Sequence, residues 1–116
     1  MVKINGDNIP EQGDILFLDY EKNAIGNEQK GRRPVLVVSD VKLNAYTNLV
    51  MVCPITSKGK HYPFQTELSK KQKTIGRVMP EQIKACNFRE RKYKYIEKIK
   101  KKELAEVLEI IKWIFF

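Results

Sequence analysis

The segment that decides the fold is GNEQKGRRP, residues 26–34, which runs directly into VLVVS, residues 35–39. The second part is apolar and mostly β-branched, long enough for a strand and too short for a helix. Gly26 and Gly31 permit backbone conformations that other residues resist. The proline before the strand biases Arg33 toward an extended conformation. The sequence therefore predicts a polar loop that delivers charged side chains to the start of a buried strand.

Other short apolar runs predict further strands, separated by turn residues. The expected strands are residues 14–20, 35–39, 49–53, 62–68, 75–79, 82–86 and 93–99. Pro54 is expected to end the strand before it. Residues 1–11 show no clear period and are expected to be a tail or a short lead-in, and residues 40–48 are expected to be a connection.

The C-terminal segment changes to a helical period. Its apolar residues fall on one stripe: Leu104, Val107, Leu108, Ile111, Ile114 and Phe115. Trp113 and Phe116 widen this stripe beyond what one core face needs, which predicts packing on a second subunit. Short strands followed by one helix predict a mainly β fold with a C-terminal helix, in a single domain over residues 1–116.

Composition favours a polyanionic partner. Among 116 residues, 22 Lys and Arg face 14 Asp and Glu, giving a net charge of +8. Such an excess suits nucleic acid, a membrane surface or an acidic peptide, although a merely lysine-rich surface is the alternative. Cys53, Cys86 and His61 are too few for a disulfide framework or a structural zinc site, and the cysteines are expected in the core. The start resembles no signal peptide and no run could span a bilayer, so a reduced, cytoplasmic protein is expected.

Polar residues near the start of the central strand suit chemistry on RNA phosphates. Arginine presents a planar fork of donors to phosphate oxygens, hydroxyls can donate to the same group, and a carboxylate can accept a proton. The candidate site for a metal-free reaction, in which the RNA 2′-hydroxyl attacks the adjacent phosphate, therefore comprises Glu28, Gln29, Arg32, Arg33, Thr56 and Ser57. A simple ion pair between Arg33 and Glu28 that pins the loop is the alternative.

Several motifs in order carry a family resemblance. They are G-x-E-Q-x-G-x-R-P-V-L-V-V-S at 26–39, Asn44, V-C-P-I-T-S at 52–57, Y-P-F at 62–64, G-x-V at 76–78 and E-Q-I-K at 81–84. Over about nine-tenths of its length the chain resembles the MazF/PemK family of toxin endoribonucleases. One such motif would be a weak signal, but several in the family's order and spacing are a specific one.

The resemblance implies a small PemK-like barrel, related to the SH3 barrel, of about five to seven strands. It also implies a homodimer that cleaves single-stranded mRNA at short sequences without a metal or cofactor, leaving a 2′,3′-cyclic phosphate and a 5′-hydroxyl. Toxins of this family belong to type II toxin–antitoxin pairs. The implied partner is a cognate antitoxin with an acidic, largely disordered C-terminal segment.

The resemblance also assigns residues. Arg33 matches the family's catalytic arginine, Thr56 its catalytic threonine, and Glu28 an acidic residue proposed in some members as general base. Because a guanidinium stays protonated, Arg33 is expected to stabilise transition-state charge. The predicted RNA-binding residues are Asn27, Gln29, Arg32, Ser57, Lys58, Lys60, His61, Glu81 and Gln82. The basic residues in the segment 89–102 could also bind along an RNA strand. The alternative is that these charges lie on a solvent-exposed face without a binding role.

Two departures from the family pattern qualify this assignment. Asn27 stands where many relatives have Ser or His, so a hydroxyl or imidazole role is lost there. Met79 and Glu81 stand where another branch of the family places a basic residue and an aspartate.

Two rival functions share the same fold and charge. Gyrase-directed toxins of this fold end their helix in Trp-Gly-Ile and lack the Arg-Pro and Thr-Ser pairing, whereas this chain has both parts of that pairing and ends W-I-F-F, residues 113–116. A plain RNA-binding barrel would explain the charge. It gives no reason for Glu28 beside a phosphate site, where a carboxylate repels the ligand.

Overall fold

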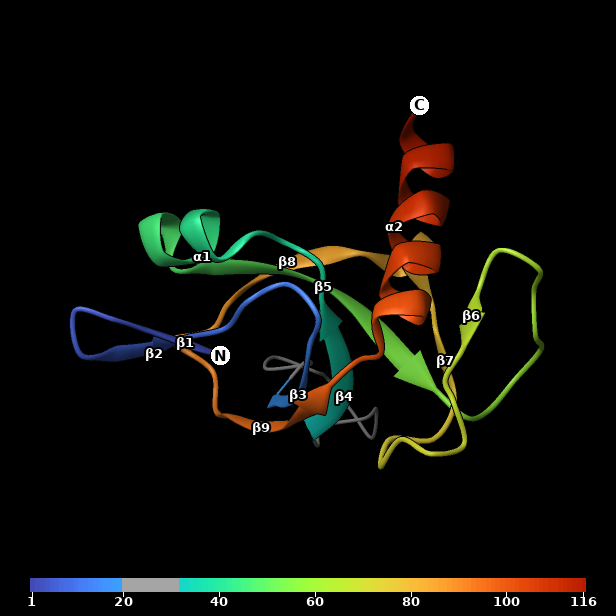
Figure 1. The fold of residues 1–116 in the computed structure, drawn as a ribbon, viewed down its shortest axis with the longest axis horizontal. Helices are drawn as coiled ribbons and strands as arrows, with labels where there is room; N and C mark the ends of the chain where they lie inside the picture. The colour runs from blue at the N-terminus through green and yellow to red at the C-terminus, as the bar shows by residue number, and fades with distance from the viewer. Residues whose placement is uncertain (20–31) are drawn as a thin grey trace, which may run out of the picture.

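A seven-stranded sheet organises the computed structural model, which describes residues 1–19 and 32–116 (Figure 1). Its strands are β3 (Asp14–Asp19), β4 (Arg32–Val37), β5 (Leu49–Thr56), β6 (Thr66–Glu67), β7 (Arg77–Val78), β8 (Lys84–Asn87) and β9 (Tyr93–Lys98). The order is β6-β7-β5-β4-β3-β9, and β8 pairs with β5 off this path. With one long helix at the C-terminal end, the predicted mainly β fold is confirmed.

Strand β4 lies at the centre of this sheet because both of its faces are apolar. Val35 and Val37 belong to one buried cluster, and Leu36 belongs to a second cluster on the opposite face. Successive side chains of a strand point to opposite faces, so a continuous apolar run requires cover on both sides. Cys53 and Cys86 are buried in these two clusters, as expected for small core residues. Burial, with the nearby charge of Glu81, raises the pKa of Cys53 to about 12.

Strand β5 continues through the proline that was expected to end it, so that expectation is wrong. Pro54 pairs with Val35 of β4, and its carbonyl accepts a hydrogen bond of 2.9 Å from the backbone N–H of Met79. Proline has no backbone N–H to donate, but it keeps its carbonyl as an acceptor. It is therefore tolerated at a strand position where only the carbonyl forms a hydrogen bond. The last residues of β5 then pair with β7, which brings Thr56 into the sheet.

The N-terminal segment is a hairpin, so the expectation of a tail or short lead-in without strands is wrong. Strands β1 (Val2–Ile4) and β2 (Asp7–Ile9) pair antiparallel around Asn5 and Gly6, which have φ of 52° and 87°. Asn-Gly is the preferred pair for such a two-residue turn. Strands of this length show no recognisable period. Ile9 is buried in the core, and Ile4 packs against the same cluster, so both strands of the hairpin are anchored there.

The expected connection after β4 contains a helix, α1 (Val41–Thr47). Asp40 caps it by accepting a 2.8 Å hydrogen bond from the N–H of Lys42, and Asn48 ends it at φ 63°. Aspartate at the N-cap and asparagine in the left-handed region are favourable helix ends. Asn44 is fully buried, and its side-chain amide donates to the carbonyl of Pro10 at 2.8 Å, which connects the helix to the segment after β2.

The expected strand over residues 62–68 is reduced to β6. Tyr62 and Gln65 form a turn, because the Gln65 N–H donates to the Tyr62 carbonyl at 3.1 Å. The alternating aromatic rings of Tyr62 and Phe64 stack on each other at 5.2 Å instead of lying on one sheet face. Beyond β7, a short 3₁₀ helix, η1 (Pro80–Gln82), separates β7 from β8.

Helix α2 (Lys101–Phe115) has the predicted position and packs its buried side against η1 and β6. Val107 is fully buried, whereas Trp113 is 72% exposed and Phe116 is fully exposed. Figure 1 shows the last turns of α2 extending beyond the strands toward the C-terminus. None of the helices in the described ranges has the length and apolar character needed to cross a bilayer.

Candidate functional site

A cavity of about 220 Å³ opens where β4 begins and β5 ends. Its polar lining side chains are Arg33, Thr56, Ser57 and Lys58, and its apolar lining residues are Pro34, Ile55 and Ile75. Among the described residues that line this cavity, none is acidic. The cavity therefore presents a guanidinium, an ammonium and two hydroxyls to whatever enters it, a donor set that matches an anionic phosphate group.

The register of the two central strands brings Arg33 and Thr56 together. Val35 of β4 lies opposite Pro54 of β5 in an antiparallel pair. Arg33 precedes Val35 by two residues and Thr56 follows Pro54 by two. In an antiparallel pair these two positions meet at the same end, and the spacing of two keeps both side chains on the same face.

The hydroxyl of Thr56 is oriented by the turn that follows it. Its Oγ1 accepts a hydrogen bond of 3.1 Å from the N–H of Lys58 and lies 3.4 Å from the Lys58 carbonyl. Local hydrogen bonds of this kind are typical of Ser and Thr in turns. The side chain is only half-buried, so the oriented hydroxyl remains open to the cavity.

Glycine at position 76, directly before β7, allows a close approach to Thr56. Gly76 has φ +126°, and a Cβ atom added there would lie 2.3 Å from the Thr56 carbonyl oxygen and 3.1 Å from the Ser57 nitrogen. Only glycine fits such a position without moving the backbone. Part of the resemblance motif at 76–78 thus has a direct structural reason.

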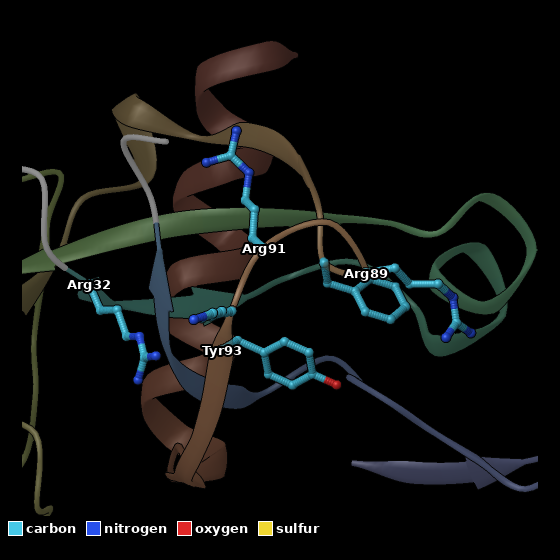
Figure 2. Close-up of a pocket in the computed structure, with 6 residues that line it drawn as sticks. Arg32, Arg89, Arg91 and Tyr93 are labelled. Atoms are coloured by element: carbon cyan, nitrogen blue, oxygen red, sulfur yellow. The ribbon is translucent and has the colours of Figure 1, made fainter. Parts of the chain in front are cut away.

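Arg32 lies in a different pocket, of about 430 Å³ (Figure 2). The other residues that line it are Phe88, Arg89, Arg91, Lys92 and Tyr93. Figure 2 shows Arg32 on β4 at one side, Arg89 and Arg91 on the segment that leads into β9, and Tyr93 at the start of β9. Successive residues of a strand point to opposite faces, which explains why Arg32 and Arg33 separate.

Hydrogen bonds and ring contacts hold the side chains of this second, basic pocket in place. Arg89 donates from Nε to Oδ1 of Asn48 at 2.6 Å and lies over the Phe88 ring at 5.1 Å. Arg91 donates to the Asp19 carbonyl at 2.9 Å. Burial raises the pKa of Tyr93 against the opposing charge of Arg89. Two cations of the pocket, Arg89 and Arg91, are therefore held by fixed contacts close to the Tyr93 phenol.

The remaining predicted contacts lie on two segments beside the first cavity. Lys60 and His61 are exposed on the loop that continues from Ser57 and Lys58. Glu81 and Gln82 lie on η1, where Oε2 of Glu81 accepts a 2.6 Å hydrogen bond from Gln65. Asn27, Glu28 and Gln29 fall outside the described residues, so their predicted roles stay predictions.

Sequence reasoning missed a buried arginine, Arg77, that connects these two segments. Its side chain is 7% exposed and bonds the backbone of Lys58 and Lys60. The available signal was a charged residue inside the apolar run of residues 75–79, because a charge in a short buried strand needs fixed partners.

Solved structures share this architecture. MazF from Deinococcus radiodurans aligns with a TM-score of 0.82 and 31% identity, covering 94% of this chain and 98% of that one. A crystal structure of the MazE-MazF complex from the same organism aligns with a TM-score of 0.81 and 28% identity, covering 94% and 97% of the two chains. The fold and the strand-end cavity thus define a MazF-like domain.

Sequence comparison agrees with the structural matches. The family model of PemK-like, MazF-like toxins of type II toxin–antitoxin systems matches residues 11–115. The endoribonuclease toxin MazF of Escherichia coli K12 is 32% identical over 83 residues, which cover 72% of this chain and 73% of that protein. Endoribonuclease PemK of Escherichia coli is 32% identical over 102 residues, covering 84% and 76%. The chain belongs to the PemK-like, MazF-like toxin family, and the predicted resemblance is confirmed.

Proposed function

We propose that this chain is a sequence-selective endoribonuclease that cleaves single-stranded mRNA without a metal, and the toxin of a type II toxin–antitoxin pair. The observation that carries the proposal is the shared cavity of Arg33 and Thr56, two residues that lie within the sequence motifs on which the family resemblance rests. The relatives named as endoribonucleases support the same reading. We further propose that residues 1–116 form one toxin domain.

The proposed reaction is an internal transesterification of RNA. The 2′-hydroxyl loses its proton to a base, for which Glu28 is the candidate, and its oxygen attacks the adjacent phosphorus. Arg33 and the Thr56 hydroxyl donate to the non-bridging oxygens as negative charge accumulates on them. The bond from phosphorus to the 5′ oxygen breaks, and that oxygen takes up a proton. The products are a 2′,3′-cyclic phosphate and a 5′-hydroxyl.

Binding of the RNA involves residues on both sides of the cavity. Ser57 and Lys58 line the cavity itself, and the other proposed contacts are Asn27, Gln29, Lys60, His61, Glu81 and Gln82. Arg32, in the separate basic pocket, is proposed to hold a phosphate of the flanking RNA. Phosphate contacts fix the position of a strand, whereas contacts to exposed base edges select its sequence.

The proposed partners follow from family membership and charge. A net charge of +8 suits an antitoxin with an acidic C-terminal segment as well as it suits RNA. The Deinococcus radiodurans relative was solved together with MazE, which supports an antitoxin partner here. The exposed apolar end of α2 supports a homodimer. A cytoplasmic location is proposed because mRNA is the substrate.

The decisive experiment incubates the purified protein with a long unstructured RNA in excess EDTA and maps the new ends. Discrete cuts with 5′-hydroxyl ends, absent in the Arg33→Ala variant, would support the proposal. Full cleavage by a folded Arg33→Ala variant would contradict the assignment of Arg33. The EDTA ensures that a trace metal nuclease does not produce the signal.

Two other outcomes would favour the rival functions. Inhibition of gyrase supercoiling by a protein that leaves RNA intact would indicate a gyrase-directed toxin of the same fold. Tight RNA binding without cleavage, together with stronger binding by Glu28→Gln, would indicate a plain RNA-binding barrel.

A further inference from the structure

A buried arginine lies behind the loop that follows Thr56. Arg77 is the first residue of β7, where it pairs with Thr56 on one side and Glu67 on the other. Only 7% of this residue is exposed. A buried charge costs free energy unless hydrogen bonds compensate it, so the partners of this guanidinium define what it does.

The guanidinium of Arg77 joins both sides of a turn. Its Nη2 donates to the carbonyl of Lys58 at 2.6 Å and to the carbonyl of Lys60 at 2.8 Å. These two carbonyls flank Gly59, which has φ +82°. A single planar group therefore fixes the tip of the 57–61 loop, and the fixed fork geometry of arginine suits this task.

A buried glutamine extends these contacts to η1. Oε1 of Gln65 accepts from Nε of Arg77 at 2.9 Å and from the N–H of Tyr62 at 3.3 Å. Its Nε2 donates to Oε2 of Glu81 at 2.6 Å, and only 5% of the residue is exposed. Arg77, Gln65 and Glu81 thus form a chain of hydrogen bonds, here called the Arg77 network.

Stability alone is a weak reason for this network. Replacing a buried charged group by an apolar side chain of similar volume is often neutral or stabilising. What the Arg77 network fixes is the position of the 57–61 loop relative to η1. These two segments carry six of the predicted RNA contacts, which are Ser57, Lys58, Lys60, His61, Glu81 and Gln82.

We propose that Arg77 is a positioning residue that sets the RNA sequence at which this protein cuts. It touches no reacting atom. It holds the 57–61 loop and η1 in the one relative arrangement that fits the preferred bases, and Arg33 and Thr56 then act on the phosphate that this arrangement presents. The inference rests on the proposed endoribonuclease function.

The test compares three variants with the wild type. Arg77→Met keeps the length of the side chain and removes every donor, and Arg77→Lys keeps the charge but lacks the planar fork. Lys3→Met, at an exposed position of β1, is the matched control for the loss of one charge. Each protein is given the long RNA in EDTA for cut mapping. Its kcat and KM are then measured on the preferred sequence and on RNAs that differ from it by one base.

For Arg77→Met we expect discrimination between the preferred sequence and its one-base variants to fall by about tenfold or more. The product ends should stay unchanged, and new cut sites should appear. Arg77→Lys should recover part of the discrimination, and Lys3→Met should match the wild type. A folded Arg77→Met protein with the wild-type cut profile would overturn the inference.

A second variant and a second measurement test the positioning role independently of Arg77→Met. Gln65→Met breaks the link to η1 while leaving the bonds from Arg77 to the loop carbonyls, so it should relax the cut profile even if Arg77→Met fails to fold. Amide hydrogen exchange at residues 58–62 should rise in both variants. An inactive wild type would overturn the proposed function, whereas unchanged exchange in the variants would overturn the positioning role itself.

Discussion

Thr56 carries the most specific prediction at the scale of single residues. Its hydroxyl is oriented by the N–H of Lys58, 3.1 Å away, and faces the cavity that holds Arg33. Thr56→Val should lower the single-turnover cleavage rate by about 10²-fold or more, because one donor to the developing charge is lost. Thr56→Ser should keep most of the activity.

Thr47 offers a matched control for this change. Its hydroxyl also bonds to local backbone, donating to the Leu43 carbonyl at 2.8 Å, but it lies on α1. Thr47→Val should leave the rate unchanged. Wild-type cleavage by Thr56→Val would remove Thr56 from the catalytic set.

Arg32 should act on binding and not on the chemical step. It lies in the basic pocket, away from the cavity of Arg33 and Thr56. In an inactive Thr56→Val background, Arg32→Gln should weaken RNA binding for every sequence and reduce the slope of log K against log salt by about one. Fluorescence anisotropy over a salt series measures both. An unchanged slope would show that Arg32 contacts no phosphate.

The sequence predicted that Arg33, Thr56 and Ser57 lie together near the start of the central strand, but it did not predict that Arg32 lies apart from them. Arg33 and Thr56 stand at fixed places in two motifs, and the register of β4 and β5 brings them together. Arg32 neighbours Arg33 in sequence and still lies in another pocket, because strand residues alternate between faces. Arg77 was missed because its partners are backbone carbonyls of another segment, which no motif records.

At the scale of secondary structure elements, Gly76 couples β7 to the end of β5. An added Cβ would lie 2.3 Å from the Thr56 carbonyl oxygen. Gly76→Ala should therefore shift the Thr56 peptide, destabilise the fold by about 1–3 kcal/mol and lower kcat/KM at least tenfold. Thermal unfolding and cleavage kinetics measure the two effects.

Gly6 provides the control for backbone strain. It has φ +87° in the hairpin turn, and an added Cβ there would have no neighbour within 4 Å. Gly6→Ala should cost stability through its backbone conformation and leave kcat/KM unchanged. If both variants lose activity equally, the close contact at Thr56 is not the cause.

The hydrogen bonds between Glu97 of β9 and the loop before β7 should stabilise the fold in a pH-dependent way. Glu97 accepts hydrogen bonds from the N–H groups of Lys73 and Thr74 at 3.1 and 2.7 Å. Burial acts to raise the pKa of Glu97, but these hydrogen bonds lower it below its ordinary value of 4.5. The stabilisation is therefore complete above pH 4.5 and is lost as the pH falls through the lowered pKa.

Glu97→Gln tests this dependence. The variant should have a lower Tm than the wild type near neutral pH, and the difference should shrink as the pH falls below 4.5 and through the lowered pKa of Glu97. Thermal unfolding followed by circular dichroism over a pH series measures it. A difference that stays constant over the series would mean that the charge of Glu97 has no role.

Helices and strands with a clear hydrophobic periodicity were predicted, whereas elements defined mainly by their capping or turn residues were not. Helix α2 and strands β3, β4 and β9 agree with prediction within a few residues. Helix α1 was missed because its ends are defined by capping residues, Asp40 at the N-cap and Asn48 at the C-cap, and its sequence shows no clear apolar stripe. The 62–68 strand was overpredicted because its alternating rings stack in a turn.

For the whole molecule, the exposed end of α2 predicts the state of association. Trp113 is 72% exposed and lines an apolar cavity of about 470 Å³ with Pro63, Phe64, Glu109 and Ile110. An exposed apolar surface of this kind marks an association site. Trp113→Glu should shift a dimer toward monomer in sedimentation velocity, and Lys101→Glu at the exposed start of the helix should not. A wild type that sediments only as a monomer would contradict the proposed homodimer.

The sequence by itself determined the family, the mainly β fold with its C-terminal helix and the residue types of the site, because these depend on local patterns and motif spacing. Only the tertiary structure decided which of those residues meet. The 220 Å³ cavity, the separate basic pocket and the Arg77 network all join segments far apart in the chain. Such contacts depend on strand register and on the sheet face to which each side chain points. A register shift of one residue would change the pairing and move every side chain of the strand to the opposite face.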